Sequence, residues 1–290
     1  MKIYRPFNFS INNTPMKAKQ NIRIAILFVS LAFISNKSFA CSIVYYVDST
    51  TGKIYVANNE DYWYKTKNYM QIMPAKKGKM ARIWYGWNKF AQGGINSSGL
   101  FMDGAATPKQ RIPKGYRNPN GRNVGDEILA YCHTVQEAID YLEKEKIAVS
   151  EGHIFLGDST GNAAIVEWVK GKKNIINIES NVLIATNFLL SDTNAGNFPC
   201  VRYQSIEERI NNLKESNDSI NLRSFGNVIA GAVQPPIKDS NGKEGGTLYS
   251  TFIDIKDGVF VLVPKLDNKR VIKLDLNDEF RRKRRKKIKF

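Results

Sequence analysis

Short hydrophobic runs separated by polar turn residues follow one another along most of the chain after residue 40. Such runs occupy residues 42–47, 53–57, 152–157, 163–168, 174–178, 182–185, 247–255 and 259–263. Runs of β-branched and aromatic residues, separated by turns that contain Gly, Asn or Asp, are typical of antiparallel strands. The pattern predicts antiparallel sheets that begin with a β-hairpin over residues 42–57.

Three segments instead have the spacing of amphipathic helices. The first begins with the capping box Thr134-Val135-Gln136-Glu137, and the others span residues 202–213 and 224–233. A Ser or Thr followed three residues later by Glu marks a helix N-terminus. Hairpins together with clustered helices predict an α+β fold, in which helices cover antiparallel sheets.

The first 40 residues are typical of a secretory signal peptide. A basic start (Lys17, Lys19) precedes an apolar stretch over residues 24–34, and small residues stand at Ser38 and Ala40. The stretch is shorter than the roughly 20 apolar residues that span a bilayer. We therefore expect a signal peptidase to remove residues 1–40, from Met1 or from an internal start at Met16, and to send the protein to the periplasm or outside the cell.

Cys41 directly follows this predicted cleavage site. A mature chain that begins there carries a thiol and a free α-amino group on one residue. The alternative is a lipoprotein signal, in which Cys41 is lipidated and anchors a surface protein without catalytic activity. That signal favours Leu three residues before the cysteine, where this chain has Ser38.

The net charge of +16 is concentrated at the two ends of the chain. Of 43 Lys and Arg residues, six lie in residues 1–40 and eight in residues 281–290, which leaves 29 against 27 Asp and Glu between them. A nearly neutral body, predicted as one domain over residues 41–280, does not indicate nucleic-acid binding. The terminal block predicts a solvated basic tail that contacts solvent or an anionic surface.

Few residues suggest metal or disulfide chemistry. Cys41, Cys132 and Cys200 are an odd number, so at least one thiol is unpaired, and pairing of the other two stays open. Cys132 lies among apolar residues and is expected to be a core residue. His133 and His153 have no second ligand at metal spacing, so we expect no metal and no cofactor.

The predicted hairpin returns Asp61 to the beginning of the first strand, next to Cys41. A carboxylate there can hold an α-ammonium group or order a thiol. The alternative is an ordinary acid at a strand end that faces water.

Several blocks occur in the order found in one known family. They are Cys41 with its hairpin to Asn59-Glu60-Asp61, residues 92–100 with Asp103-Gly104, residues 153–167, residues 185–187, Arg202-Tyr203 and residues 247–251. With them the chain resembles the N-terminal nucleophile (Ntn) hydrolases of the choloylglycine hydrolase and penicillin V acylase family. The resemblance implies a four-layer αββα sandwich and hydrolysis of a linear amide in a small N-acyl substrate, with N-acyltransferases among the relatives.

The resemblance also implies roles for four residues. Cys41 matches the nucleophile, and Asp61 matches the acid that holds its amino terminus and thiol. Asn187 matches the oxyanion-binding asparagine, and Arg202 matches an arginine that supports the site. From the residues alone, Asn187 could instead cap its own strand end, and Arg202 could pair with a glutamate of its own helix.

Weaker expectations concern substrate binding. The same blocks suggest Asn59, Asn96 and Asp103 as substrate-binding residues, although Asn96 also suits a turn. The aromatic residues Tyr62, Trp63, Tyr64, Trp84 and Trp87 could form an apolar acyl pocket or pack within the sheets.

The chain departs from the family pattern in two places. Asn58 stands where many relatives have an arginine, so a cation that favours the thiolate is missing. The interval from Asn187 to Arg202 is shorter than in bile-salt hydrolases, where a longer segment supports oligomer assembly. The short interval argues against bile salts as the substrate and against the tetramer of the bile-salt hydrolases, and the oligomeric state stays open.

Overall fold

A computed structural model describes residues 41–216 and 219–290 of the chain. The chain divides into two units, Met1–Lys37 and Ser38–Phe290, and all described residues belong to the second. The predicted signal peptide over residues 1–40 lies outside the described residues. None of the helices in the described part is long and apolar enough to cross a membrane.

Two antiparallel sheets form the centre of this unit, as the strand patterns predict. The first sheet contains β1 (Ser42–Val47), β2 (Ile54–Trp63), β10 (Val182–Ala185), β11 (Ile237–Lys238), β12 (Glu244–Asp254), β13 (Val259–Pro264) and β14 (Ile272–Asp275). The second contains β3 (Tyr69–Met73), β4 (Arg82–Trp87), β5 (Phe90–Asn96), β6 (Phe101–Ala106), β7 (Gly152–Gly157), β8 (Ala163–Val169), β9 (Lys172–Asn177) and β15 (Lys286–Lys289).

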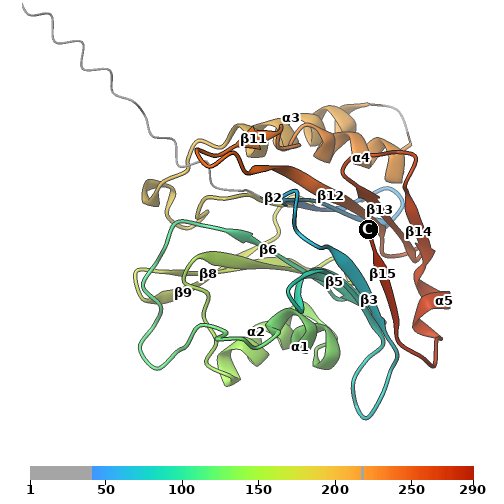
Figure 1. Cartoon of the computed structure of the whole chain (residues 1–290), viewed down its shortest axis with the longest axis horizontal. Coiled ribbons are helices and arrows are strands. Elements are labelled where there is room, and N and C mark those ends of the chain that lie inside the picture. The colour runs from blue at the N-terminus through green and yellow to red at the C-terminus, as the bar shows by residue number, and fades with distance from the viewer. Residues whose placement is uncertain (1–40, 217–218) are drawn as a thin grey trace, which may run out of the picture. The chain divides into compact units, whose positions relative to one another are not determined.

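Helices cover the outer face of each sheet, which gives the predicted αββα order of layers (Figure 1). The helices α3 (Val201–Glu215) and α4 (Leu222–Ala230) pack on the first sheet, and α1 (Val124–Tyr131) and α2 (Val135–Lys144) pack on the second. A short α5 (Leu276–Phe280) follows β14. The α+β Ntn-type sandwich expected from the sequence is therefore confirmed.

Alternation along β1 and β2 assigns each residue to one of two cores. Ile43 and Tyr45 point between the two sheets, whereas Val44 and Tyr46 point toward α3 and α4. Successive side chains of a strand point to opposite faces, so a single register decides which residues enter which layer. The space between the sheets is the larger core, and Cys41 belongs to it.

The basic block at the C-terminus is not the solvated tail that its charge predicts. Its residues Lys286–Lys289 form β15, which pairs antiparallel with β3 at the edge of the second sheet. Ile288 and Phe290 pack against the core between the sheets, and the Phe290 ring lies edge-on to Tyr249 with centroids 5.2 Å apart. The two apolar residues among the lysines supply the period-two pattern of a strand, so the domain continues past residue 280 to the end. Lysines on an edge strand discourage pairing with other chains, and contact with an anionic surface stays a prediction.

Candidate active site

The β1–β2 register places a carboxylate beside the candidate nucleophile. Ser42 pairs with Asn59, so Cys41 lies opposite Glu60 at the beginning of β1. The Cys41 thiol donates a hydrogen bond to Glu60 Oε1 at 3.0 Å, and both residues are more than nine-tenths buried. The side-chain partner of the thiol is thus Glu60, one residue before the expected Asp61.

Asp61 is bound on the other side of the same strand. Its Oδ1 accepts a hydrogen bond from Thr247 Oγ1 at 2.6 Å, and its Oδ2 lies 3.2 Å from Arg202 Nη1. Because side chains alternate along β2, this carboxylate faces the layer that contains α3, which carries Arg202. Asp61 is therefore an ion-paired buried acid, not a strand-end acid facing water.

Arg202 connects Asp61 to Asn187. Its Nη2 donates to Asn187 Oδ1 at 3.1 Å, while its Nη1 reaches Asp61. The Asn187 amide nitrogen donates to the Ala106 carbonyl at 2.7 Å. Four residues that the sequence singles out thus lie at one place in the fold, since Cys41 and Asp61 share the strand pair and Arg202 links Asp61 to Asn187. The Arg202 side chain thus reaches residues of two other segments, Asp61 on β2 and Asn187 after β10.

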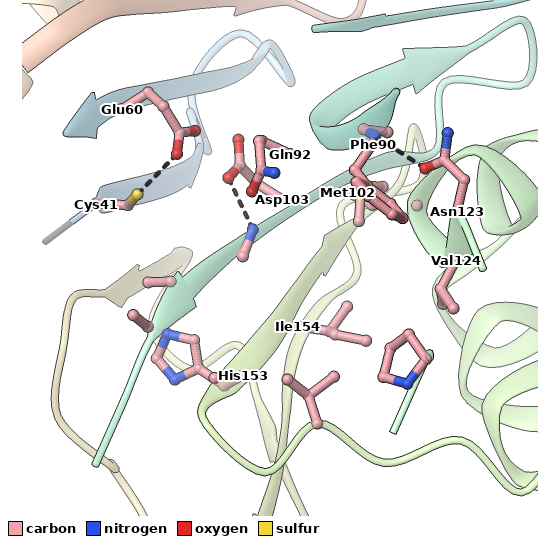
Figure 2. Close-up of a pocket in the computed structure, with 18 of the residues that line it drawn as sticks. Cys41, Glu60, Phe90, Gln92, Met102, Asp103, Asn123, Val124, His153 and Ile154 are labelled. Atoms are coloured by element: carbon pink, nitrogen blue, oxygen red, sulfur yellow. Dashed lines mark hydrogen bonds between the residues drawn. The ribbon is translucent and has the colours of Figure 1, made fainter. Parts of the chain in front are cut away.

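A cleft of about 520 Å³ opens beside Cys41. Figure 2 shows Cys41, Glu60 and Asp103 at one end and the side chains of Met102, Val124 and Ile154 toward the other. The cleft therefore has an acidic end at the thiol and an apolar end away from it. Such a mixed lining is typical of small-molecule sites.

Burial and neighbouring charge set the protonation of the acidic end. Burial first, and then the charges of Glu60 and Asp61, raise the pKa of the Cys41 thiol well above its ordinary value. Burial also raises the pKa of Asp61 to about 7, although Thr247 and Arg202 oppose the shift. The thiol is therefore protonated at neutral pH in this state, and a reaction at Cys41 needs a group that accepts its proton.

Two residues suggested for substrate binding are structural instead. The Asn59 side chain points toward α4, where its Nδ2 donates to Ile229 O at 2.9 Å and its Oδ1 accepts from Ser250. Asn96 Nδ2 donates to the carbonyls of Leu129 and Cys132, and its Oδ1 accepts from the turn that follows it. Both residues are fully buried and are not among the residues that line the cleft, so the contacts that this structure shows for them are structural.

Asp103 does line the cleft, as expected. Its Oδ2 accepts from Tyr85 Oη at 2.9 Å and its Oδ1 from the Gly104 amide at 2.7 Å. Of the aromatic candidates, Tyr62 and Trp87 line the cleft with their rings stacked 4.9 Å apart, whereas Trp84 packs under α1. The aromatic set therefore divides between the two roles that the sequence left open.

The sequence reading missed a His–Glu pair behind the cleft. His153 lines the cleft, and its Nδ1 lies 3.2 Å from Glu167 Oε1. Glu167 also accepts the backbone N–H groups of Leu190 and Ser191. Because these residues directly follow the Asn187 segment, Glu167 fixes the loop that carries Asn187. His153 and Glu167 are the first and last residues of a block that resembles the family. That block was the signal in the sequence from which the pair could have been found.

All three cysteines are free, so Cys132 and Cys200 are not paired in this structure. Cys132 belongs to the core between α1, α2 and the second sheet, as expected. Within residues 41–216 and 219–290, there is no group of three or more His, Cys, Asp or Glu side chains that could hold a metal ion.

Comparison with protein families identifies the group to which this site belongs. Residues 48–265 match the family described as acyl-coenzyme A:6-aminopenicillanic acid acyl-transferase. The chain belongs to this acyl-transferase family. The match begins just after Cys41 and covers most of the domain. No curated protein sequence matches the chain in a direct comparison.

Solved structures of Ntn hydrolases share the fold of this chain. A variant of the conjugated bile acid hydrolase from Clostridium perfringens superposes with a TM-score of 0.69 at 17% identity, covering 86% of this chain and 97% of the other. Penicillin V acylase from Agrobacterium tumefaciens gives a TM-score of 0.66 at 19% identity, covering 85% and 90%. The N-acylethanolamine-hydrolyzing acid amidase ortholog of Caenorhabditis elegans gives 0.51 at 14% identity, covering 84% and 98%. At these identities the likeness establishes the fold.

Proposed function

We propose that the mature protein is an N-terminal cysteine amidohydrolase that cleaves the linear amide bond of a small N-acyl substrate. One observation carries the proposal: Arg202 joins Asp61 to Asn187 beside the buried thiol of Cys41. These residues come from separate segments, and they are those that the family resemblance assigns to catalysis. The match to the acyl-transferase family supports the same chemistry.

The reaction requires Cys41 to be the first residue. An α-amine with an ordinary pKa of about 7.7–8.0 is partly neutral at pH 7, so it can accept the thiol proton. The thiolate then attacks the amide carbonyl, and the leaving amine departs with that proton. Water hydrolyses the resulting acyl-thioester.

Asn187 is proposed to bind the negative charge on the tetrahedral intermediate. Its amide nitrogen has two hydrogens, of which one is donated to Ala106 O. Arg202 fixes the amide through its oxygen, which holds the remaining N–H in one orientation. Donors preorganised in this way typically contribute about 3–4 kcal/mol to the transition state.

Activation is proposed to occur during export. A signal peptidase would remove residues 1–40 and release the enzyme into the periplasm or outside the cell. Intact mass and N-terminal sequencing of the exported protein should show an unmodified Cys41 at the start. A lipid on that residue, or cleavage elsewhere, would contradict the mechanism and favour the anchored surface protein.

Two variants test the catalytic assignment. Cys41→Ser, or one extra residue before Cys41, should lower acyl release by at least about 10³-fold because each removes the nucleophile or the base. Cys132→Ala serves as the matched control, since that thiol lies in a different core. Full activity of either test variant, measured on a panel of N-acyl amides, would exclude the mechanism.

N-acyl transfer is the second candidate, because the family that matches the chain is described as an acyl-transferase. The two reactions share the acyl-thioester and differ in whether water or an amine resolves it. Product analysis with and without an added primary amine separates them. A transferase forms a new amide at the expense of the free acid.

A further inference from the structure

Two buried carboxylates share the acidic end of the cleft. Glu60 and Asp103 are 2% and 0% exposed, and they come from different sheets, Glu60 from β2 and Asp103 from β6. Figure 2 shows the Glu60 carboxyl group beside the Cys41 thiol, with Asp103 next along the lining of the cleft. The charge of Asp103 is the largest electrostatic influence on Glu60 after burial, which places the two groups close together in low dielectric.

The backbone leaves room for this pair. Gly93 lies on β5 next to Asp103, and a Cβ atom built there would come within 2.2 Å of Asp103 Oδ2. The same atom would come within 2.6 Å of the Tyr85 ring and hydroxyl. The Asp103 carboxylate therefore occupies space that any side chain at residue 93 would take.

No described side chain supplies a cation for the pair. Neither Glu60 nor Asp103 forms a salt bridge with a Lys, Arg or His side chain of residues 41–216 and 219–290. The two nearby guanidinium groups are engaged elsewhere, because Arg202 pairs with Asp61 and Arg122 with Glu127 and Glu145. Buried acids without a cation are costly and usually pair with one or hold a proton.

One carboxylate oxygen lacks a well-placed donor in the described structure. Glu60 Oε1 accepts from the Cys41 thiol, whereas Glu60 Oε2 is buried and has no hydrogen bond of good geometry among the described residues. The Tyr249 hydroxyl is near enough to lower the pKa of Glu60, but it too is left without a well-formed hydrogen bond. Buried acceptors in proteins are nearly always satisfied. An unsatisfied carboxylate oxygen in the lining of a cleft, next to a second acid, indicates that a donor arrives with the ligand.

From this geometry we infer that the cleft selects amides that carry a protonated amine close to the scissile carbonyl, with Glu60 and Asp103 as the residues that bind the cation. The inference rests on the proposed amidohydrolase function and names its substrate class. The ammonium group donates to Glu60 Oε2 and is attracted by both carboxylates. The uncharged remainder of the substrate lies along Met102, Val124 and Ile154.

The protonation of the two carboxyl groups supports the same inference. Burial raises the pKa of Asp103 to about 8 and that of Glu60 well above its ordinary value, so the pair holds a proton near neutral pH. Binding of a cation lowers both pKa values and releases that proton. Affinity for the ammonium substrate therefore rises as the pH approaches about 8. The titratable groups that face the pair are Cys41 directly before β1, Asp61 from β2, Tyr85 from β4 and Tyr249 from β12.

Two matched substrate pairs test the inference on the processed enzyme. β-Alanyl and butanoyl para-nitroanilide have the same length and differ in an ammonium or a methyl group on the acyl side. The phenylacetyl amides of ethylenediamine and of propylamine make the same change on the amine side. In at least one pair, we expect the ammonium member to have a kcat/KM about 10- to 100-fold higher, as one charge-assisted hydrogen bond allows.

The variants Glu60→Gln and Asp103→Asn then remove one charge each with little change in shape. Each should lower the ratio of kcat/KM for the ammonium member to kcat/KM for the neutral member about tenfold or more, mainly through KM. The ratio cancels any loss that both substrates share because Glu60 also contacts the Cys41 thiol. Glu244→Gln is the control, because it removes an exposed carboxylate that pairs with Lys238 outside the cleft. It should leave the preference unchanged.

Three results would overturn the inference. The first is wild-type enzyme that shows no preference in either pair. The second is an equal loss for charged and neutral substrates in Glu60→Gln, which would mean that the acid serves the amino group of Cys41 itself. The third is equal affinity of Cys41→Ser for the charged and neutral members, measured by calorimetry. This binding test applies even if none of the amides is cleaved, a result that would reject the proposed function alone.

Discussion

Glu60 and Asp61 are neighbours on β2, yet their surroundings are opposite. Asp61 faces the helix side of the first sheet and has a guanidinium and a hydroxyl as partners. Glu60 faces the space between the sheets and has a thiol and a second acid. Both residues line the cleft, but one carboxylate is paired with a guanidinium and the other has no cationic side chain beside it. The comparison shows how alternation along a strand gives two neighbouring acids different partners.

The largest effect is expected from removing the cation on the Asp61 side. Arg202→Met leaves a buried carboxylate with Thr247 alone and frees Asn187 from its anchor. We expect a loss of about 3–5 kcal/mol in the free energy of unfolding at pH 8, measured by denaturant titration. Activity should fall as well. Arg209→Met on the same helix is the control. Its guanidinium donates to the Asn227 carbonyl in an exposed contact, so its loss should cost far less. A similar cost in both would mean that Arg202 acts only as a helix surface residue.

The pH dependence of stability is the next test of Asp61. Its pKa rises on folding from 3.8 to about 7, so the folded state binds the proton more tightly than the unfolded state does. The stability that this group contributes is complete below pH 4 and is lost as the pH rises through about 7. We expect Asp61→Asn to remove roughly 2–4 kcal/mol of that pH dependence between pH 4 and 8. Parallel stability curves for the two proteins would show that Asp61 is not perturbed.

Asn59 tests whether a β2 side chain that faces the helices affects stability but not substrate binding. In Asn59→Ala the buried carbonyl of Ile229 and the hydroxyl of Ser250 lose their partner. The expected cost is about 1–3 kcal/mol in unfolding free energy, with KM unchanged because the side chain does not line the cleft. A raised KM without a loss of stability would restore the sequence-based assignment of Asn59 to substrate binding.

The smallest effect is expected in the space between the two sheets, where the Tyr85 hydroxyl donates a hydrogen bond to Asp103. Tyr85→Phe removes the hydrogen bond to Asp103 and a longer one from Thr251, and it should cost about 1 kcal/mol in stability. The Tyr85 hydroxyl lowers the pKa of Asp103, so its loss should move that pKa above about 8. The measurement is the pH profile of kcat/KM for an ammonium substrate, whose rising limb should shift to higher pH. An unchanged profile would separate Asp103 from recognition of the cation.

Part of the fold was accessible from local pattern. The β1–β2 hairpin, the later strands and α2 with its Thr134 cap follow from alternation and capping chemistry. The strands β3 to β6 were not predicted from their pattern. Gln71, Arg82, Gly93 and Asp103 interrupt their apolar runs, and a bulge at Tyr85 and Gly86 breaks the period of two. Residues buried on both faces of an inner strand give no alternation to recognise.

The helix α1 was also hidden. It has eight residues and contains Gly125, whose missing side chain lets the helix approach the Ala91 carbonyl on β5. A glycine inside a short helix weakens its local signal. Gly125 lets α1 pack closely on the sheet, and this packing cannot be recognised in the sequence.

The sequence by itself determined the candidate nucleophile, the hairpin behind it and the family blocks that mark Asp61, Asn187 and Arg202, because these signals are local. Tertiary structure alone decided what each side chain contacts. Arg202 reaches Asp61 across 141 residues, the charged C-terminus adds a strand, and Asn59 turns away from the cleft while Glu60 enters it. These outcomes depend on which face of each strand packs against which layer. That choice is made by the burial of the whole core, so no short segment contains it.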